Sequence, residues 1–338
     1  MAAPGAGPAT LADVARLAGV SPATASRVLT GHPHVRPDTR RRVEEAMTRL
    51  GYARHRAAWS AGARRAGAIA FVMCEESARV FADPFFAQLL WGVSRELAAA
   101  DSQLVLLTLH SARECQTAAR YLRGGHADGA LFVSMHHRLP LDPGKLGIPV
   151  VLCGRPVGGA AGLPYVDADN AGGAERATRY LLRTGRTAVA TIAGPLDMGP
   201  GVDRLRGYRA AMAAAGRFDP GLVVHGDFTA GSGEQAALRL LGQRRQLDAI
   251  FAASDLMALG ALRALRRAGR RVPGDVAVIG FDDSPLARHA DPALSTVRQP
   301  FGAMAVRLAR ELLAVIDGTA TGPAGVVLGT ELILRDSS

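Results

Sequence analysis

The stretch Thr10–Val35, TLADVARLAGVSPATASRVLTGHPHV, places two short amphipathic patterns on either side of one Gly-Val-Ser. In the first pattern, apolar residues recur at the spacing of one helical face, at Leu11, Val14, Ala15 and Ala18. Gly19 predicts the end of that helix. Ser21 predicts the N-cap of a second helix, whose apolar positions are Ala25, Val28 and Leu29. The stretch therefore predicts two helices joined by a tight turn, with Val20 filling the angle between them.

A third helix is expected to begin near Pro37 and Asp38 and to end at Gly51. Its predicted buried positions are Val43, Ala46, Met47 and Leu50. Three short helices with a glycine-containing turn between the first two form a helix-turn-helix unit. In such a unit the second helix enters the major groove of DNA, N-terminal residues first.

The charge of the chain is concentrated at its N-terminal end. Residues 1–66 hold eleven arginines against four acidic residues, whereas the whole chain has a net charge of +10. This asymmetry indicates an anionic partner, either nucleic acid or an anionic lipid surface, unless it is simply a solvated basic face. The helix-turn-helix pattern favours nucleic acid.

Base contacts are expected from Pro22, Ala23, Ser26 and Arg27, on the exposed side of the second helix. Arg27 can donate two hydrogen bonds to guanine, and Ala23 can make an apolar contact with a thymine methyl group. The alternative for Arg27 is simple neutralisation of a phosphate.

Other classes of protein are not indicated. No apolar run approaches the roughly 20 residues of a membrane span, and the N-terminus lacks the pattern of a signal peptide, so we expect a cytoplasmic protein. Cys74, Cys115 and Cys153 lack disulfide or zinc spacing and are expected to be reduced thiols. His136-His137 and His32-x-His34 lack a third ligand nearby, so no metal or cofactor is predicted.

The motifs of common enzymes are also missing, because the sequence contains no nucleophile elbow, phosphate-binding loop or HExxH pair. Asp282 and Asp283 are adjacent at a predicted strand end, which turns their side chains in different directions. That suits one ligand-binding and one structural carboxylate better than an acid/base pair, and we expect no enzyme.

From Gly67 onward, short apolar strands alternate with helical segments such as 85–100 and 171–184. The predicted strands are GAIAFVM, QLVLLTL, GALFVS and PVVLC in a first set, and AVATIA, LVVHG, DAIFAA and VAVIG in a second. Continuous apolar strands of this kind are typical of parallel sheets covered on both faces. The two sets predict two doubly wound lobes with a ligand between them, near the carboxyl ends of the strands.

Three motifs in order, TLADVARLAGVSPATASRVLTG, TRRRVEEAMTRLGY and VPGDVAVIGFDDS, resemble the LacI/GalR family of transcription regulators over nearly the whole chain. The resemblance implies an all-α helix-turn-helix headpiece (8–56), a hinge segment (57–66) and an α/β two-lobed periplasmic-binding-protein-like core (67–338) with two doubly wound parallel sheets. The N-lobe would span 67–166 and 298–325, and the C-lobe 167–297 and 326–338. The chain would cross between them near Val166, Val297 and Gly325.

The resemblance also implies two sets of site residues. The DNA-binding set is Ser21, Pro22, Ala23, Thr24, Ser26, Arg27, Arg36, Tyr52, His55, Arg56, Ala58, Trp59 and Ala61. The effector-binding set is Phe86, Arg204, Phe228, Ser254 and Asp282. Ser254 stands where many sugar-binding members have asparagine, and the two phenylalanines stand where the family stacks aromatic rings on the ligand, although core packing also explains them. A structural salt bridge is the alternative for Arg204 and Asp282.

The hinge segment departs from the family pattern. Arg54 and His55 replace the usual Pro-Asn, and Ala61 takes the place of the leucine that wedges into the minor groove. A methyl group is too small to unstack a base step well. Trp59 either takes over the wedge or packs in a pair of hinges.

We therefore expect a repressor that binds a palindromic DNA operator as a homodimer and is controlled by a small, sugar-like effector between the lobes. A corepressor-dependent regulator with a non-sugar effector is the alternative. A solute-binding protein would need an export signal, and a non-specific nucleoid binder would not need a two-lobed core. A leucine-heptad tail is missing after TELILRDSS, which favours a dimer over a tetramer.

Overall fold

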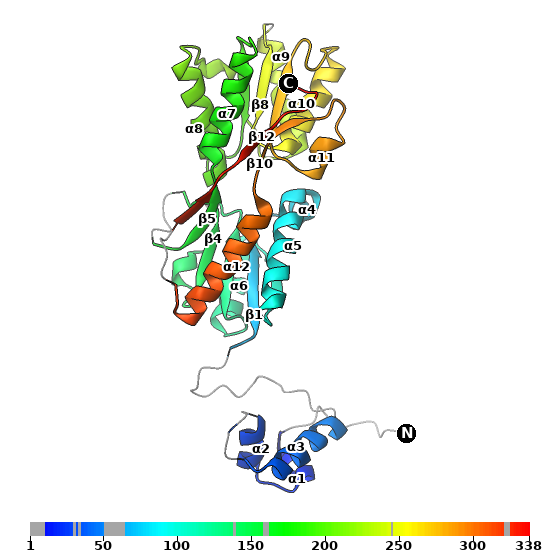
Figure 1. Ribbon diagram of the computed structural model, residues 1–338, viewed down its shortest axis with the longest axis vertical. Coiled ribbons are helices and arrows are strands. Elements are labelled where there is room, and N and C mark those ends of the chain that lie inside the picture. Colours follow the sequence, from blue (N-terminus) through cyan, green and yellow to red (C-terminus); the bar gives the residue numbers. More distant parts are fainter. Residues whose placement is uncertain are drawn as a thin grey trace. The chain divides into compact units, whose positions relative to one another are not determined.

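The computed structural model describes residues 11–29, 32, 35–50, 65–137, 140–157, 162–244, 246–320 and 325–338, with the side chain of Leu29 excepted. It divides the chain into a small helical unit, which ends at Arg64, and a larger unit that begins at Arg65. We call them the headpiece and the core. Figure 1 shows their elements.

The headpiece contains the three predicted helices: α1 (Leu11–Ala18), α2 (Pro22–Leu29) and α3 (Pro37–Leu50). They share one small core, made by Val14, Ala15, Ala18, Ala25, Val28, Val43 and Ala46, against which Val20 and Met47 pack partly buried. The prediction for Leu50 was wrong: it is 36% exposed, because it lies in the last turn of α3, outside this cluster.

The N-lobe of the core is built on a six-stranded sheet with the order β11-β5-β4-β3-β1-β2. Its strands are β1 (Ala68–Met73), β2 (Gln103–Thr108), β3 (Gly129–Val133), β4 (Val150–Cys153), β5 (Tyr165–Ala168) and β11 (Gly325–Leu328). All neighbours in this sheet are parallel. Alternate side chains of β1 enter two separate apolar clusters, one on each face. This is the burial that continuous apolar strands predict.

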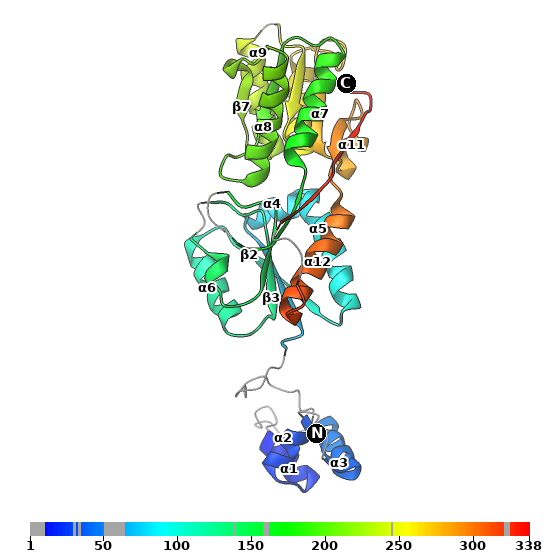
Figure 2. The same ribbon diagram turned by 60° about the vertical axis from the view of Figure 1, so that its left-hand side comes forward.

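Helices cover both faces of the N-lobe sheet, as Figure 2 shows. On one face α5 (Pro84–Ala99) packs against α12 (Phe301–Asp317), and on the other lies α6 (Ala112–Arg123). The short helix α4 (Ser77–Ala82) precedes α5, and a 3-10 turn spans Pro143–Lys145.

The C-lobe has a second six-stranded sheet, ordered β12-β10-β9-β8-β6-β7. Its strands are β6 (Val189–Ala193), β7 (Val223–His225), β8 (Ala249–Ala252), β9 (Ala277–Asp282), β10 (Ser295–Arg298) and β12 (Glu331–Ile333). The sheet is parallel except for β12, which is antiparallel to β10. The pair α7 (Asn170–Arg183) and α8 (Gly199–Ala214) covers one face, and the pair α9 (Ala230–Gln243) and α10 (Asp255–Arg267) covers the other. The small helix α11 (Pro285–Arg288) follows β9, and a 3-10 turn spans Pro220–Leu222.

Three segments join the lobes, and they lie side by side in Figures 1 and 2. The chain leaves the N-lobe after Ala168, returns after Arg298 and leaves again between Leu328 and Glu331. The third crossing was predicted too early, at Gly325, because β11 continues to Leu328 in parallel register with β5. The first crossing, expected near Val166, begins where β5 ends at Ala168. Among the described residues, no helix is long and apolar enough to span a membrane.

Candidate functional site

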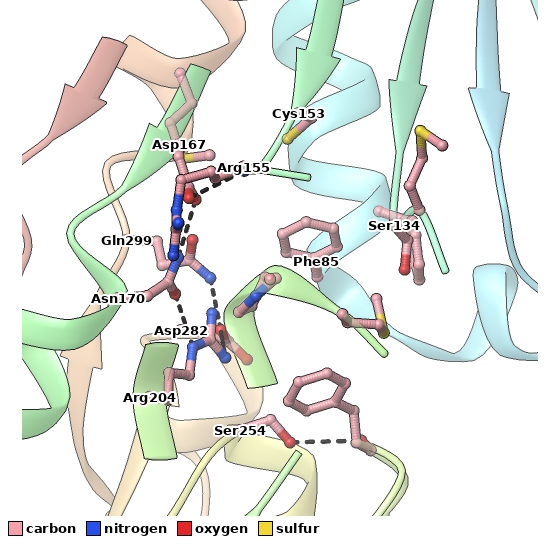
Figure 3. A pocket seen from close by; sticks show the side chains of 18 of the residues that line it. Phe85, Ser134, Cys153, Arg155, Asp167, Asn170, Arg204, Ser254, Asp282 and Gln299 are labelled. Atoms are coloured by element: carbon pink, nitrogen blue, oxygen red, sulfur yellow. Dashed lines mark hydrogen bonds and ion pairs between the residues drawn. The ribbon is translucent and has the colours of Figure 1, made fainter. Parts of the chain in front are cut away.

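A cleft lies between the lobes, at the carboxyl ends of both sheets, and encloses about 810 Å³ of space that is partly continuous with solvent. The N-lobe lines it with α4, α5 and the segments after β3 and β4, and the C-lobe with α8 and the segments after β7, β8 and β9. This is where ligands bind in doubly wound sheets. Figure 3 shows the side chains that converge there.

All five predicted effector residues line this cleft: Phe86, Arg204, Phe228, Ser254 and Asp282. They come from four elements or loops of the C-lobe and one helix of the N-lobe, so the fold brings together residues up to 196 positions apart in sequence. Their role in binding stays a prediction.

The two phenylalanines differ in their surroundings. Phe86 is 2% exposed and packs in the N-lobe core. Its neighbour Phe85, which we did not predict, also lines the cleft and meets Phe86 edge to face at 5.1 Å between ring centroids. Phe228 has a φ of +70°, a conformation that non-glycine residues rarely adopt. Its ring lies 5.6 Å from the guanidinium carbon of Arg79 in the N-lobe and 5.7 Å from that of Arg204.

Arg204 is the central buried cation of the cleft. Its Nε donates to the Asn170 side-chain oxygen at 2.8 Å, and its Nη1 donates to the Ala253 carbonyl at 2.6 Å. Nη1 also lies 3.4 Å from Oδ1 of Asp282, and the guanidinium stacks 3.8 Å above the Phe281 ring. The salt bridge that we weighed as an alternative is therefore present, in the wall of the cleft.

Burial raises the pKa of the Asp282 carboxyl, while the charge of Arg204 opposes that rise. Burial also lowers the pKa of Arg204. A strained backbone accompanies this pair, because φ is +124° at Asp282 and +53° at Asp283. The two carboxylates diverge as predicted: Asp283 lies outside the cleft lining and pairs with Arg298 and Arg335.

Polar residues on the crossing segments extend the site, and we missed them in the sequence. Gln299 donates to Asp282 at 2.7 Å, and Asn170 donates to Asp167 at 2.9 Å. Each follows or ends a strand that reaches the cleft. Their position just after a strand could have identified them in the sequence. The strands β5 and β10 are, however, short and interrupted by polar residues, which makes them hard to recognise.

The charges of the lining are balanced. Six charged side chains line the cleft, the cations Arg79, Arg155 and Arg204 and the anions Asp83, Asp167 and Asp282. Burial raises the pKa of Asp83 and of Asp167. Together with the neutral amides and the aromatic rings, this lining suits a ligand with many hydroxyl groups and no net charge.

In the headpiece, Ser21 caps α2, since its Oγ accepts a hydrogen bond from the Thr24 amide at 3.1 Å. Pro22, Ala23, Arg27 and Arg36 are exposed, whereas Thr24 and Ser26 are half-buried. Pro22, Ala23 and Arg27 thus lie on the exposed side of α2 as expected, whereas Ser26 is less exposed than expected. Their role in DNA binding stays a prediction. Tyr52, His55, Arg56, Ala58, Trp59 and Ala61 lie outside the described residues, so nothing here tests the predictions for the hinge.

Comparison with known proteins decides the family. The model of bacterial regulatory proteins, lacI family, matches residues 10–55, and that of the periplasmic binding protein-like domain matches residues 178–338. The HTH-type transcriptional regulator CelR of Thermobifida fusca is 46% identical over 332 residues, which cover 97% of this chain and 98% of that protein. The chain belongs to the LacI family. It is a helix-turn-helix transcription regulator with a two-lobed sensor core.

Solved structures of LacI-family proteins agree over the full length. A CelR–cellobiose complex matches with a TM-score of 0.79 at 45% identity, covering 98% of this chain and 100% of that one. The Lac repressor dimer bound to operator and the anti-inducer ONPF matches with a TM-score of 0.79 at 26% identity, covering 98% and 99%. The predicted fold class and family are confirmed.

Proposed function

We propose that this LacI-family regulator is a repressor that binds a pseudo-palindromic operator as a homodimer and is released by a neutral disaccharide of the cellobiose type. The observation that carries the ligand class is the balanced set of three cations and three anions around aromatic rings. The similarity to CelR, whose complex with cellobiose is known, supports the same class.

The chemistry of the cleft fits such a ligand. A sugar ring offers an apolar face of C–H groups, which aromatic side chains cover, and a rim of hydroxyls, which paired donors and acceptors hold. Phe85 and Phe228 supply rings, and Asp282, Asn170 and Ser254 supply polar groups. The cleft is partly open to solvent, so a ligand can enter between the lobes. The lining has no excess of positive charge with which to hold a phosphate group.

The proposal includes two further points. The protein acts on chromosomal DNA in the cytoplasm, and it has no catalytic activity. Its cleft does hold carboxylates, so incubation with cellobiose followed by assay for released glucose tests the second point directly. Release of glucose would overturn it.

The first experiment is selection of bound sequences from random duplex DNA by the full-length protein, followed by titration with cellobiose, maltose and a sugar phosphate. We expect an enriched palindrome and release from it by cellobiose alone. Tighter DNA binding on addition of sugar would make the sugar a corepressor. Uniform protection of DNA without a palindrome would overturn the assignment of a sequence-specific regulator.

A further inference from the structure

The His136-His137 pair, which gave no metal site in the sequence, lies between the lobes. His136 follows β3 in the N-lobe, and its imidazole is held on both sides. Its Nε2 lies 3.1 Å from Oε1 of Glu75, which follows β1 in the same lobe. Its Nδ1 lies 3.0 Å from Oδ2 of Asp197, which belongs to the C-lobe loop between β6 and α8. One side chain thus joins carboxylates of both lobes.

Backbone and side-chain contacts beside His136 also cross between the lobes. The His137 amide donates to the Asp197 carbonyl oxygen at 3.0 Å. In another contact between the lobes, Arg155 of the N-lobe donates to both carboxylate oxygens of Asp203 in α8, at 2.5 and 2.7 Å. We call the arrangement in which these contacts form the closed form. It brings the N-terminus of α8 against the segment after β4, and both line the cleft.

The position of His136 is fixed from within the N-lobe. Ser134 has a φ of +58°, in the left-handed region, and its Oγ donates to Oε1 of Glu75 at 2.6 Å. Arg79 of α4 lies 2.8 Å from the same oxygen. Glu75 is 6% exposed, and its Oε1 contacts three side chains at once, those of Ser134, Arg79 and His136. The N-lobe half of the contact is preassembled, and Asp197 completes it only when the lobes meet.

The charges around His136 favour its protonated form. Among the described residues, the groups that face it are Glu75 and Asp197, with Arg79 and Asp83 behind Glu75. The hydrogen bond to Glu75 raises the pKa of His136 above its ordinary value, burial opposes this, and the hydrogen bond to Asp197 raises it further. Part of the rise therefore comes from the C-lobe and exists only in the closed form.

We propose that His136 and Asp197 form a latch between the lobes, a contact outside the ligand itself that sets how readily the cleft closes on its effector. The side chains of both are about three-quarters buried, at 23% and 25% exposure, so water weakens their interaction less than that of a surface pair. His136 is a positioning residue in this scheme, because it acts through the geometry of the lobes.

The latch makes closure depend on pH in a defined direction. A histidine whose pKa is higher in the closed form stabilises that form while it is protonated, and this contribution is lost as the pH rises through the closed-form pKa. Each unit by which closure raises the pKa corresponds to about a tenfold change in the balance between closed and open forms. The effector affinity is expected to fall in the same direction, a consequence that rests on the proposed function.

Amide hydrogen exchange of the full-length protein without ligand tests the latch directly. The amide of His137 reports the closed form, since it bonds across the lobes, and the amide of Leu109, bonded to Met73 within the N-lobe, is the internal reference. We expect the protection factor at His137, corrected for intrinsic exchange, to fall roughly tenfold between about pH 6 and about pH 9. The protection at Leu109 should not change.

Variants separate the latch from a merely structural contact. Asp197→Asn removes the C-lobe charge and keeps the shape, so the protection at His137 should be low at both pH values. His136→Gln keeps a hydrogen-bonding side chain without a charge, so its protection should not respond to pH. Asp219→Asn is the matched control, because it removes a carboxylate of the same lobe that pairs with Arg244 away from the cleft. It should behave like the wild type.

Calorimetric titration with cellobiose is the second measurement. Weaker binding at higher pH in the wild type, but not in His136→Gln, supports the latch. Should no variant bind cellobiose, the sugar assignment fails, while hydrogen exchange still decides the latch. Wild-type protection at His137 that is the same at both pH values, or protection at about pH 6 that is the same in Asp197→Asn as in the wild type, overturns the latch.

Discussion

Arg204 shows how much of the cleft depends on the geometry of one side chain. Arg204 is 4% exposed, and its guanidinium bonds Asn170 and Ala253 and neighbours Asp282. A planar fork can hold three partners at fixed angles, whereas an ammonium group is a point charge. Removing the charge altogether would leave Asp282 buried without a counterion, so a lysine is the informative replacement.

We predict that Arg204→Lys weakens cellobiose binding by about 1.5 to 3 kcal/mol, because hydrogen bonds to a charged group are lost while the charge stays. The thermal unfolding temperature should fall less than in Arg204→Ala. Isothermal calorimetry on both variants measures this. Arg209→Lys, an exposed position on the same helix, is the control and should bind like the wild type. Equal affinities for Arg204→Lys and Arg209→Lys would contradict the assignment.

The residue scale also shows what the sequence can predict. Arg204, Ser254 and Asp282 were predicted from a family resemblance, and all three line the cleft. Asp83, Arg155, Asn170 and Gln299 were missed, although each lies in the cleft. Their position depends on two lobes that close on each other, and no local pattern encodes that contact. His136 was noticed and left without a role, since its partner Asp197 is 61 residues away.

At the scale of elements, the N-terminus of α8 lies close to the N-lobe because Gly199 has no side chain. A Cβ on Gly199 would lie 2.2 Å from the carbonyl oxygen of Arg155, which is backbone of the other lobe. Gly199 has no left-handed φ, so an alanine there meets no conformational penalty of its own. The steric conflict exists only when the lobes are closed.

Gly199→Ala is therefore expected to weaken effector binding by about 1 to 3 kcal/mol, the usual cost of overpacking, with little loss of secondary structure. Calorimetry and circular dichroism measure the two effects. Gly302→Ala in α12 is the matched control, because nothing lies within 4 Å of the added carbon. It should bind normally and be slightly more stable. Wild-type affinity in Gly199→Ala would show that the lobes need not approach this closely.

The helix α2 gives a second prediction at this scale, because Ser21 is both its N-cap and a predicted DNA contact. Ser21→Ala should destabilise the headpiece by about 1 kcal/mol, since the Thr24 amide loses its acceptor. Ser21→Asp keeps the cap and adds a negative charge beside DNA, so it should retain stability and still weaken operator binding. Thermal denaturation and a DNA-binding assay at fixed salt separate the effects. Full operator affinity in Ser21→Asp would exclude Ser21 from the DNA interface.

The elements themselves were largely predictable. The apolar strands β1, β2, β3, β4, β6, β7, β8 and β9 lie where the sequence places them. The strands β5, β10, β11 and β12 were not predicted. β5, β10 and β12 mix polar with apolar side chains, and β11 is a four-residue strand at the edge of its sheet. These four strands carry the crossings between the lobes. The central strands are recognisable in the sequence by their continuous hydrophobicity. The strands at the crossings depend on pairing with neighbouring strands, which a local sequence pattern does not show.

At the scale of the whole molecule, Gln299 ties the cleft to a crossing segment. Gln299 lies just after Arg298, where the chain returns to the N-lobe, and donates to Asp282 in the cleft. If a ligand hydroxyl bonds Asp282, as predicted, it binds a carboxylate that already holds the crossing segment through Gln299. A ligand that binds one arrangement of the lobes more tightly than another would shift the equilibrium between those arrangements.

Thermodynamic linkage makes the predicted coupling between effector and operator quantitative, since the two ligands are expected to bind different units of one chain. If cellobiose weakens operator binding by some factor, operator DNA must weaken cellobiose binding by the same factor. Typical coupling free energies of about 1 to 3 kcal/mol correspond to roughly 5-fold to 150-fold. We predict equal ratios when the dissociation constant of each ligand is measured with and without saturating amounts of the other. Arg27→Ala should weaken operator binding by about 1 to 3 kcal/mol and leave cellobiose affinity without DNA unchanged. Unequal ratios would mean that a further equilibrium, such as dissociation of the dimer, takes part in the response, because two ligands on one species of fixed composition cannot violate reciprocity.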